Sequence, residues 1–259
     1  MSLQLDGRQR AMLQEMGVRV FLPETVVAPE YVARNVQPAP ATAVFASEKP
    51  VSAPLLARAP GIEHMAWDTL AETVAQCRAC TLCNGRRNTV FGVGDREADW
   101  LVVGEAPGEQ EDLRGEPFVG QAGALLDNML KALGLGRQRK VYIANVLKCR
   151  PPGNRNPEPD EVAQCEPFLR RQVALLRPKI ILAMGRFAVQ SLLQSTEPIG
   201  KLRGRVHAYG GVPVVVTYHP AYLLRNLPDK AKAWADLCLA MNVMAGRASG
   251  AQAAEGSGS

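Results

Sequence analysis

The chain has 259 residues, which is enough for one α/β core with further segments to spare. No apolar run approaches the length of a membrane span, and the first residues lack the basic-then-apolar order of a signal peptide, so we expect no membrane partner and no export. In the cytoplasmic location that this predicts, the six cysteines are expected to be reduced thiols or metal ligands rather than disulfides. The net charge of +5 falls between residues 67 and 246, which permits a polyanionic partner without requiring one.

The first 66 residues differ in composition from the rest. Apolar residues spaced through residues 3–20 predict a short amphipathic helix, which is either a fraying terminal helix or a segment that binds a protein partner. From Pro23 to Pro60 the chain has seven prolines and no glycine, a composition typical of an extended linker. The expected organisation is an N-terminal extension with a possible protein-docking role over residues 1–66, a folded domain over 67–246 and a disordered tail over 247–259.

Between residues 63 and 246, short apolar runs alternate with segments of helical spacing. The apolar runs predict strands over residues 100–103, 141–147, 179–183 and 212–217. Helical spacing covers about 63–77, 125–133, 160–176, 187–193 and 230–244. Buried parallel strands are continuous apolar runs, and helices return the chain between them. The order therefore predicts a doubly wound, mostly parallel α/β sheet.

Chemically versatile side chains lie at or near the carboxyl ends of these strands. Glu105 follows the first strand, Asn145 lies near the end of the second, and His219 follows the last. Phe118 lies in the acidic, glycine-rich loop after the first strand. Each residue has a bland explanation by itself, as a solvated carboxylate, a strand-end cap, a hydrogen-bonded histidine or a core phenylalanine. Because open α/β sheets bind ligands in the crevice at these ends, their joint placement predicts a site.

The cysteines form a second constellation. Cys77 and Cys80 have the C-x-x-C spacing of metal ligands, and Cys149 and Cys165 are separated by a loop and the start of a helix. Four thiolates can hold a structural zinc ion or an iron–sulfur cluster, and spacing does not decide between them. Cys83 competes for a ligand position, because Cys80 and Cys83 also have C-x-x-C spacing.

A series of ordered motifs runs through residues 77–240. They are Cys77-x-x-Cys80-x-Leu82, Gly104-Glu-Ala-Pro-Gly-Glu-Gln-Glu-Asp112, Pro117-Phe-Val-Gly120, Asn145-Val-Leu-Lys-Cys149-Arg-Pro-Pro152, Cys165 and His219-Pro-Ala-Tyr-Leu-Leu-Arg225. With these motifs the chain closely resembles the family 4 uracil-DNA glycosylases, the iron–sulfur branch of the uracil-DNA glycosylase superfamily. Ala106 departs slightly from the family, some members of which have glycine there.

The resemblance implies a fold, a cofactor and a reaction. The fold is a three-layer α/β sandwich with a four-stranded, mostly parallel sheet. The cofactor is a [4Fe-4S] cluster held by Cys77, Cys80, Cys149 and Cys165. The reaction is hydrolysis of the N-glycosidic bond of uracil in DNA, which releases uracil and leaves an abasic site. The protein is expected to act as a monomer on uracil-containing DNA, with Ala106 and Pro107 lining the base pocket.

The chemistry of excision suggests a role for each pocket residue. A flipped uracil can stack on Phe118, and the amide of Asn145 matches the N3–H donor and O4 acceptor of uracil. His219 can hydrogen-bond the negative charge that develops on O2 of uracil. Glu105 is the candidate for stabilising the oxocarbenium-like sugar or orienting the water. Glu111 is a further candidate, which either takes part in catalysis or lines the C5 edge of uracil.

DNA contacts are expected around the same strand ends. Seven basic residues lie in the loops there and could hold phosphates, namely Lys148, Arg150, Arg155, Lys201, Arg203, Arg205 and Arg225. Leu223 and Leu224 follow the histidine, and on an exposed loop they could fill the gap that a flipped base leaves. Otherwise the two leucines pack beneath the loop.

Two other functions were weighed. A related branch of the superfamily traps uracil covalently through a histidine in an inserted basic loop, but residues 153–157 contain neither a histidine nor an insertion. The domain could instead be a non-catalytic iron–sulfur module that binds DNA and is tethered to replication or repair machinery. The combination of Glu105, Asn145 and His219 argues for catalysis.

Overall fold

The computed structural model describes residues 57–255, and the surroundings of side chains within residues 57–246. These residues all belong to one compact unit, Pro50–Ser259. The helix expected over residues 3–20, most of the linker that ends at Pro60, and the proposed docking role of the N-terminal extension lie outside the described residues. Within residues 57–255, no helix combines the length and the apolar character that crossing a bilayer requires.

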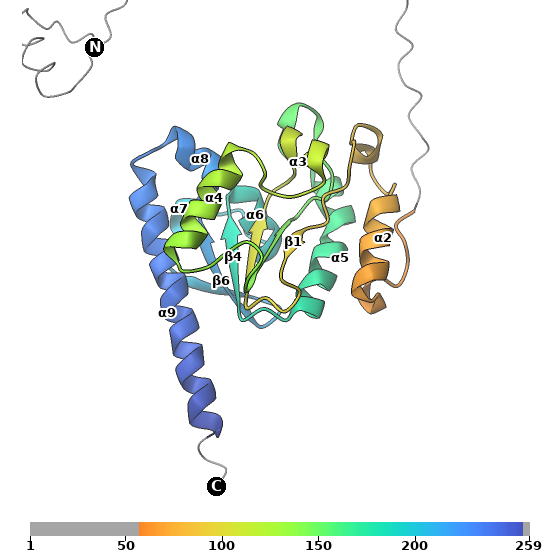
Figure 1. Ribbon diagram of the computed structural model, residues 1–259. Helices are drawn as coiled ribbons and strands as arrows, with labels where there is room; N and C mark the ends of the chain where they lie inside the picture. The colour runs from red at the N-terminus through yellow and green to blue at the C-terminus, as the bar shows by residue number, and fades with distance from the viewer. Residues whose placement is uncertain (1–56, 256–259) are drawn as a thin grey trace, which may run out of the picture. The chain divides into compact units, whose positions relative to one another are not determined.

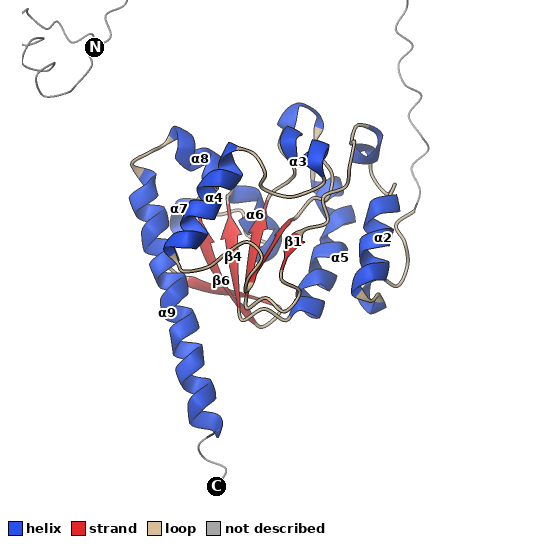
Figure 2. Ribbon diagram, in the orientation of Figure 1, coloured by secondary structure: helices blue, strands red, loops and turns tan. Residues whose placement is uncertain are grey.

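A six-stranded sheet forms the centre of the molecule (Figures 1 and 2). Its spatial order is β1-β3-β2-β4-β6-β5, and the four inner strands are parallel. The two edge strands pair antiparallel, so the sheet is mixed and the expectation of four strands is corrected. The strands are β1 (Val93–Gly94), β2 (Trp100–Gly104), β3 (Val141–Asn145), β4 (Ile180–Met184), β5 (Val206–Tyr209) and β6 (Val212–Thr217).

Physical reasons explain why the two edge strands were not predicted. β1 has only two residues, too few for a periodic pattern. β5 alternates exposed and half-buried residues, and it follows a basic turn that has no continuous apolar run. It joins β6 through Gly210 and Gly211, whose φ angles of 55° and 80° suit the two central positions of a tight hairpin turn.

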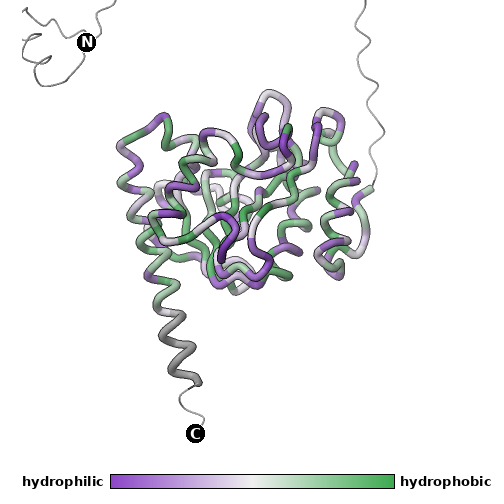
Figure 3. Tube along the Cα trace, in the orientation of Figure 1, coloured by the Kyte–Doolittle hydropathy of each residue, from purple (hydrophilic) through white to green (hydrophobic). Residues whose placement is uncertain are grey.

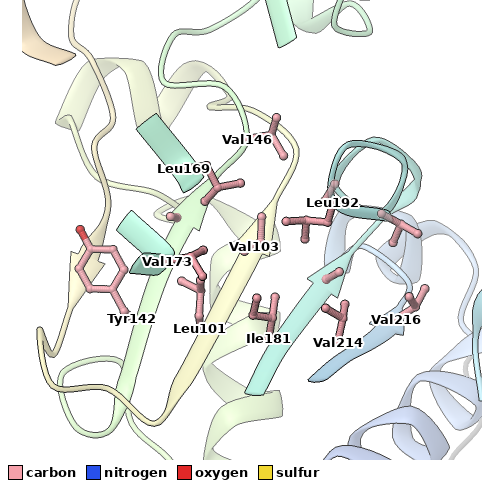
Figure 4. Packing of buried hydrophobic residues seen from close by; sticks show 14 of the residues in the cluster. Leu101, Val103, Tyr142, Val146, Leu169, Val173, Ile181, Leu192, Val214 and Val216 are labelled. Carbon is pink, nitrogen blue, oxygen red and sulfur yellow. The ribbon is translucent and has the colours of Figure 1, made fainter. Parts of the chain in front are cut away.

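Two layers of helices cover the sheet, and side chains alternate between them along each strand. On one face, Leu101, Val103 and Ile181 pack through Leu169 and Leu192 against helices α5 (Pro159–Leu176) and α6 (Arg186–Leu193) (Figure 4). The opposite face of the same strands packs against α4 (Gln121–Ala132) and α9 (Asp229–Glu255), where Val102 and Leu182 meet Leu126 and Leu237. The central strands stand out as apolar segments in Figure 3. The expected three-layer arrangement is present.

The helices match most of the predicted segments, with additions where loops were expected. They are α2 (Trp67–Gln76), α3 (Glu109–Arg114), α4 (Gln121–Ala132), α5 (Pro159–Leu176), α6 (Arg186–Leu193), α7 (Ile199–Leu202), α8 (Pro220–Arg225) and α9 (Asp229–Glu255), with 3-10 turns at Ile62–His64, Thr81–Asn84 and Pro152–Asn154. The short helices α3, α7 and α8 span one or two turns, which is too little sequence to show helical periodicity. α9 continues to Glu255, into the segment expected to be a disordered tail, because its final residues are rich in alanine, the best helix former.

The parallel register places the future site residues at one edge. Gly104 at the end of β2 lies opposite Asn145 at the end of β3, and Met184 of β4 lies opposite Thr217 of β6. The residues that follow these strands therefore emerge together. In Figure 1 this edge lies below α3 and α8.

Candidate active site at the carboxyl edge of the sheet

A cavity of about 920 Å³ opens at this edge. The residues predicted for catalysis and uracil binding all line it, namely Glu105, Ala106, Pro107, Glu111, Phe118, Asn145 and His219. They come from the ends of three parallel strands and from the loop between β2 and α4. The structure thus brings together residues that are far apart in the chain, such as Glu105 and His219, which are separated by 114 positions. Their chemical roles stay predictions at this point.

Phe118 and Asn145 form the floor of the cavity and both are buried. They approach the backbone of Gly104 so closely that a Cβ atom there would lie 2.4 Å from Asn145 Oδ1 and 2.6 Å from Phe118 Cζ. A glycine is therefore required at the end of β2. Asn145 Oδ1 is buried and accepts no hydrogen bond within the described part of the chain. A buried acceptor without a partner is costly, and at the floor of a cavity it marks a place for a ligand donor.

His219 precedes α8 and is held in one tautomer by its own helix. Its Nδ1 accepts a hydrogen bond from the backbone N–H of Ala221 at 3.1 Å, so in the neutral ring the proton is on Nε2. Burial lowers the pKa of His219 to about 4, an effect that the nearby Arg225 reinforces and Glu111 opposes. The imidazole lies nearly parallel to the ring of Phe118, with 5.4 Å between centroids and 28° between planes. At neutral pH, His219 is an uncharged donor through Nε2.

Glu105 follows β2 at the wall of the cavity. Burial raises the pKa of its carboxyl group to about 7, and the positive charge of Arg186 limits this rise. Arg186 lines the same cavity, and its guanidinium stacks over the ring of Phe187 at 4.4 Å. We did not predict Arg186 as a site residue, although it follows Gly185 directly after β4 and so carries the same strand-end signal as Glu105.

Glu111 is bound differently from the other carboxylate. Its Oε1 accepts hydrogen bonds from the backbone N–H groups of Val119 and Gly120, at 2.9 and 3.1 Å. Its Oε2 accepts from the N–H of Gly108 at 3.1 Å. The two oxygens therefore tie the start of α3 to the segment that leads into α4. This geometry favours a positioning role over the catalytic role considered from the sequence.

The two leucines expected to contact DNA lie in different environments. Because Pro220–Arg225 is helical, consecutive residues point to different faces. Leu223 is 1% exposed and packs in the interior, so its expected role as a DNA wedge is corrected. Leu224 is 40% exposed beside Arg225, which is exposed and lines the cavity.

Two of the basic residues expected to hold phosphates are used internally. Arg203 forms an ion pair with the buried Asp236 at 2.8 Å, donates to the carbonyl of Lys232 and lies over the ring of Tyr218. Lys148 is 1% exposed, and its Nζ donates to the Asn145 carbonyl and to Gln172 Oε1, at 2.8 and 2.6 Å. The DNA contacts expected of Arg203 and Lys148 are therefore corrected. Arg155 lines the cavity and is paired with Glu161.

The four predicted cysteine ligands come together beside the cavity. Cys149 and Cys165 are buried with Leu82 and Leu147, and Cys80 packs against this cluster. Cys77 packs against the neighbouring apolar cluster of Val74 and Phe168, close enough to Cys80 and Cys149 to raise their pKa values. Burial raises the pKa of Cys149 to about 11 and that of Cys165 to about 12.

Two further observations bear on what this group could hold. Among the described residues, no three Cys, His, Asp or Glu side chains lie close enough for a single metal ion. Arg86 donates a hydrogen bond to Cys149 Sγ at 3.1 Å, which is the kind of contact that an anionic sulfur receives. Cys83 contacts Asn84 Oδ1 and also lies close enough to Cys80 to raise the pKa of that thiol.

Together, the fold and the cavity bring an aromatic face, an amide and an imidazole to the carboxyl edge of a parallel sheet, which is where α/β enzymes bind their ligands. The model of the uracil DNA glycosylase superfamily matches residues 91–238, more than half of the chain. The chain belongs to the uracil DNA glycosylase superfamily.

Curated relatives refine this assignment. The type-4 uracil-DNA glycosylase of Saccharolobus solfataricus is 44% identical over 170 residues, covering 62% of this chain and 78% of that protein. The type-4 enzyme of Archaeoglobus fulgidus is 46% identical over 165 residues, covering 61% and 82%. The type-4 enzyme of Thermotoga maritima is 44% identical over 167 residues, covering 64% and 86%. The similarity therefore extends over most of each relative's length.

Proposed function

We propose that this protein is a DNA repair glycosylase that hydrolyses the N-glycosidic bond of uracil in DNA. The observation that carries the proposal is Asn145 Oδ1 at the floor of the cavity, which is buried and has no hydrogen-bond partner among residues 57–246. Uracil presents an N3–H donor beside its O4 acceptor, so the amide of Asn145 can accept from N3–H and donate to O4. The base must leave the helix to reach this floor, and the ring of Phe118 offers a face on which it can stack.

His219 is suited to stabilise the departing base. Cleavage leaves negative charge on the uracil oxygens, and a donor aimed at that charge contributes most in the transition state. With Nδ1 occupied by Ala221, the neutral imidazole can donate only through Nε2. A base stacked on Phe118 would lie roughly parallel to the imidazole, so that its O2 edge can meet this donor. We infer that His219 acts as a neutral donor to O2.

Glu105 is suited to act on the sugar side of the bond. Its ionised form can stabilise an oxocarbenium-like sugar or orient the attacking water. Burial strengthens such an interaction, because little water competes with it. The same burial raises the pKa to about 7, so the carboxylate is only partly ionised at neutral pH. This predicts that activity rises as Glu105 loses its proton.

We also propose that Cys77, Cys80, Cys149 and Cys165 hold the [4Fe-4S] cluster typical of the type-4 enzymes. Their gathering beside Arg86 and the names of the type-4 relatives support this assignment. Bound there, the cluster would link residues 77–80 to Cys149, after β3, and to Cys165 in α5. Equal amounts of iron and sulfide in the purified protein, with little zinc, are the expected result. Stoichiometric zinc without iron would contradict it.

A glycosylase assay tests the proposed function. The purified protein is incubated with a labelled oligonucleotide that contains one uracil, as a single strand and in a duplex, and abasic sites are cleaved by alkali. Release of uracil is expected, and a matched oligonucleotide with cytosine or thymine should stay intact. DNA binding without release of any base would instead support the non-catalytic module.

A further inference from the structure

Phe118 has a backbone conformation that is unusual for its residue type. Its φ angle is 56°, in the left-handed region that glycine adopts easily and a bulky side chain does not. Such a conformation costs on the order of 1 kcal/mol or more, and it persists only where surrounding contacts hold it. This conformation directs the buried ring towards Gly104 and Asn145 at the cavity floor.

Arg137 holds the peptide groups on both sides of this conformation. Its Nη1 donates to the carbonyl of Pro117 at 2.8 Å, and its Nη2 donates to the carbonyl of Phe118 at 2.6 Å. Its Nε donates to Asp127 Oδ1 at 3.0 Å, and the same carboxylate forms an ion pair with Nη2 at 2.9 Å. Asp127 on α4 thus orients the guanidinium, and the planar fork of arginine engages two consecutive carbonyls.

Two further contacts enclose the same segment. A Cβ atom at Gly123 would lie 1.8 Å from the carbonyl oxygen of Phe118, so α4 packs directly on this peptide. Glu111 accepts from the next two N–H groups, those of Val119 and Gly120. The backbone of Phe118 is therefore fastened on its carbonyl side by Arg137 and on the following amide side by Glu111. Of these two, Arg137 is the one that lies outside the residues lining the cavity.

We propose that Arg137 is a positioning residue for uracil binding, which acts by holding Phe118 in the conformation that presents its ring to the base. The proposal rests on the proposed function, and it deepens that function by naming a determinant of base stacking. Arg137 lies between α4 and β3, it does not line the cavity, and its side chain is 20% exposed. It acts through the backbone of Phe118 and touches neither the base nor the DNA.

This position distinguishes the proposal from two simpler roles. A phosphate contact would be lost with the charge and would depend strongly on salt. If the contact were purely structural, its loss would lower the melting temperature and would not affect uracil binding selectively. If Arg137 positions Phe118, its mutation should reduce affinity for uracil through weaker stacking of the base. This loss of affinity should disappear when Phe118 is itself removed.

The experiment compares Arg137→Lys, which keeps the charge but loses the fork, with Arg139→Lys as a matched control on the exposed Arg139 nearby. The readouts are the inhibition constant of free uracil, KM and kcat for a uracil oligonucleotide at several salt concentrations, and the melting temperature. We expect Arg137→Lys to weaken inhibition by uracil about tenfold, as loss of one stacked base contact does, with an unchanged salt slope. Asp127→Asn should weaken it less, and Arg139→Lys should leave it unchanged.

A double-mutant cycle completes the test. In a Phe118→Ala background, Arg137→Lys should weaken uracil inhibition less than about twofold further, because the ring that it positions is absent. An unchanged inhibition constant in Arg137→Lys, or a full tenfold loss that persists without Phe118, would overturn the positioning role. Wild-type protein that releases no uracil would overturn the proposed function instead, so the two failures are distinguishable.

Discussion

The floor and the rim of the cavity are built in different ways. At the floor, Phe118 and Asn145 are 5% and 2% exposed, and their backbones are fastened by Arg137 and Lys148. At the rim, Leu224 is 40% exposed, and Arg186 and Arg225 are exposed side chains. The floor is therefore held by internal hydrogen bonds, whereas the side chains of the rim are exposed to solvent.

This difference separates two tasks that a DNA glycosylase must perform. A preorganised floor can distinguish bases, because hydrogen-bonding groups fixed in a buried site penalise a ligand with the wrong donors. An exposed, positively charged rim can hold the sugar-phosphate backbone of any sequence. Mutations in the floor should therefore weaken binding of the base or slow the chemical step, and mutations in the rim should weaken DNA binding.

The largest effect is expected for His219. His219→Ala should lower kcat by about 10²–10³-fold, the usual result of removing one donor to a developing oxyanion. Because burial holds the pKa of His219 at about 4, the ring is neutral from pH 5 upwards and should cause no change in activity between pH 5 and 8. Single-turnover rates across this range provide the measurement. If activity instead fell as pH rose through about 6.5, and this pH dependence were absent in His219→Ala, the imidazolium would be the active form.

Glu105 should cause the pH dependence that His219 does not. With a pKa of about 7 and an active carboxylate, kcat should rise roughly tenfold between pH 6 and pH 8. Stability should change in the opposite direction. The folded-state pKa lies above the ordinary value of 4.5, so stability is fully present below pH 4.5 and falls as pH rises through 7.

Glu105→Gln separates the two consequences of this pKa. It should abolish the pH-dependent rise in kcat and stabilise the protein at pH 8 by about 1 kcal/mol, a value discounted because the side chain is partly exposed. Denaturant unfolding at pH 5 and pH 8 measures the second effect. Equal stability of the two proteins at pH 8 would mean that burial of the ionised carboxylate does not destabilise the folded state.

A smaller effect is expected at the rim. Arg225→Ala should raise KM for a uracil oligonucleotide a few-fold with little change in kcat. It should also reduce the slope of log affinity against log salt by about one, because one phosphate contact is lost. Arg139→Ala, at the other edge of the sheet, is the charge-matched control. A slope that is unchanged in Arg225→Ala would remove this residue from the DNA surface.

Local patterns in the sequence were sufficient for the fold class and for the position of the site. The four inner strands are continuous apolar runs, so their existence and their shared carboxyl edge could be predicted, and with them the cavity around Glu105, Asn145 and His219. Features that depend on distant contacts could not. The edge strands β1 and β5 are too short or too polar to show a pattern, and the short helix α8 buries Leu223 while it exposes Leu224.

The same limit applies to the charged residues. Arg203, Lys148 and Arg137 have no sequence feature that distinguishes an internal hydrogen bond from a contact with DNA. Their partners are Asp236, Gln172 and Asp127, which lie 33, 24 and 10 positions away. Only the fold determines these pairings. Arg186 is the exception, because its place directly after β4 could have indicated it.

Exchanging the amide of Asn145 for a carboxyl group tests most directly whether this residue reads uracil. Release of uracil and of cytosine from matched oligonucleotides is measured for the wild-type protein and for Asn145→Asp. The wild-type protein should release only uracil. With cytosine, the amino group would face the NH2 of Asn145 and the N3 acceptor would face its oxygen, at a cost of roughly 1–3 kcal/mol for each unpaired group. Asn145→Asp should lose uracil release by orders of magnitude and permit slow cytosine release at low pH. Near-normal uracil release by Asn145→Asp would contradict the account, because the base would then be read elsewhere.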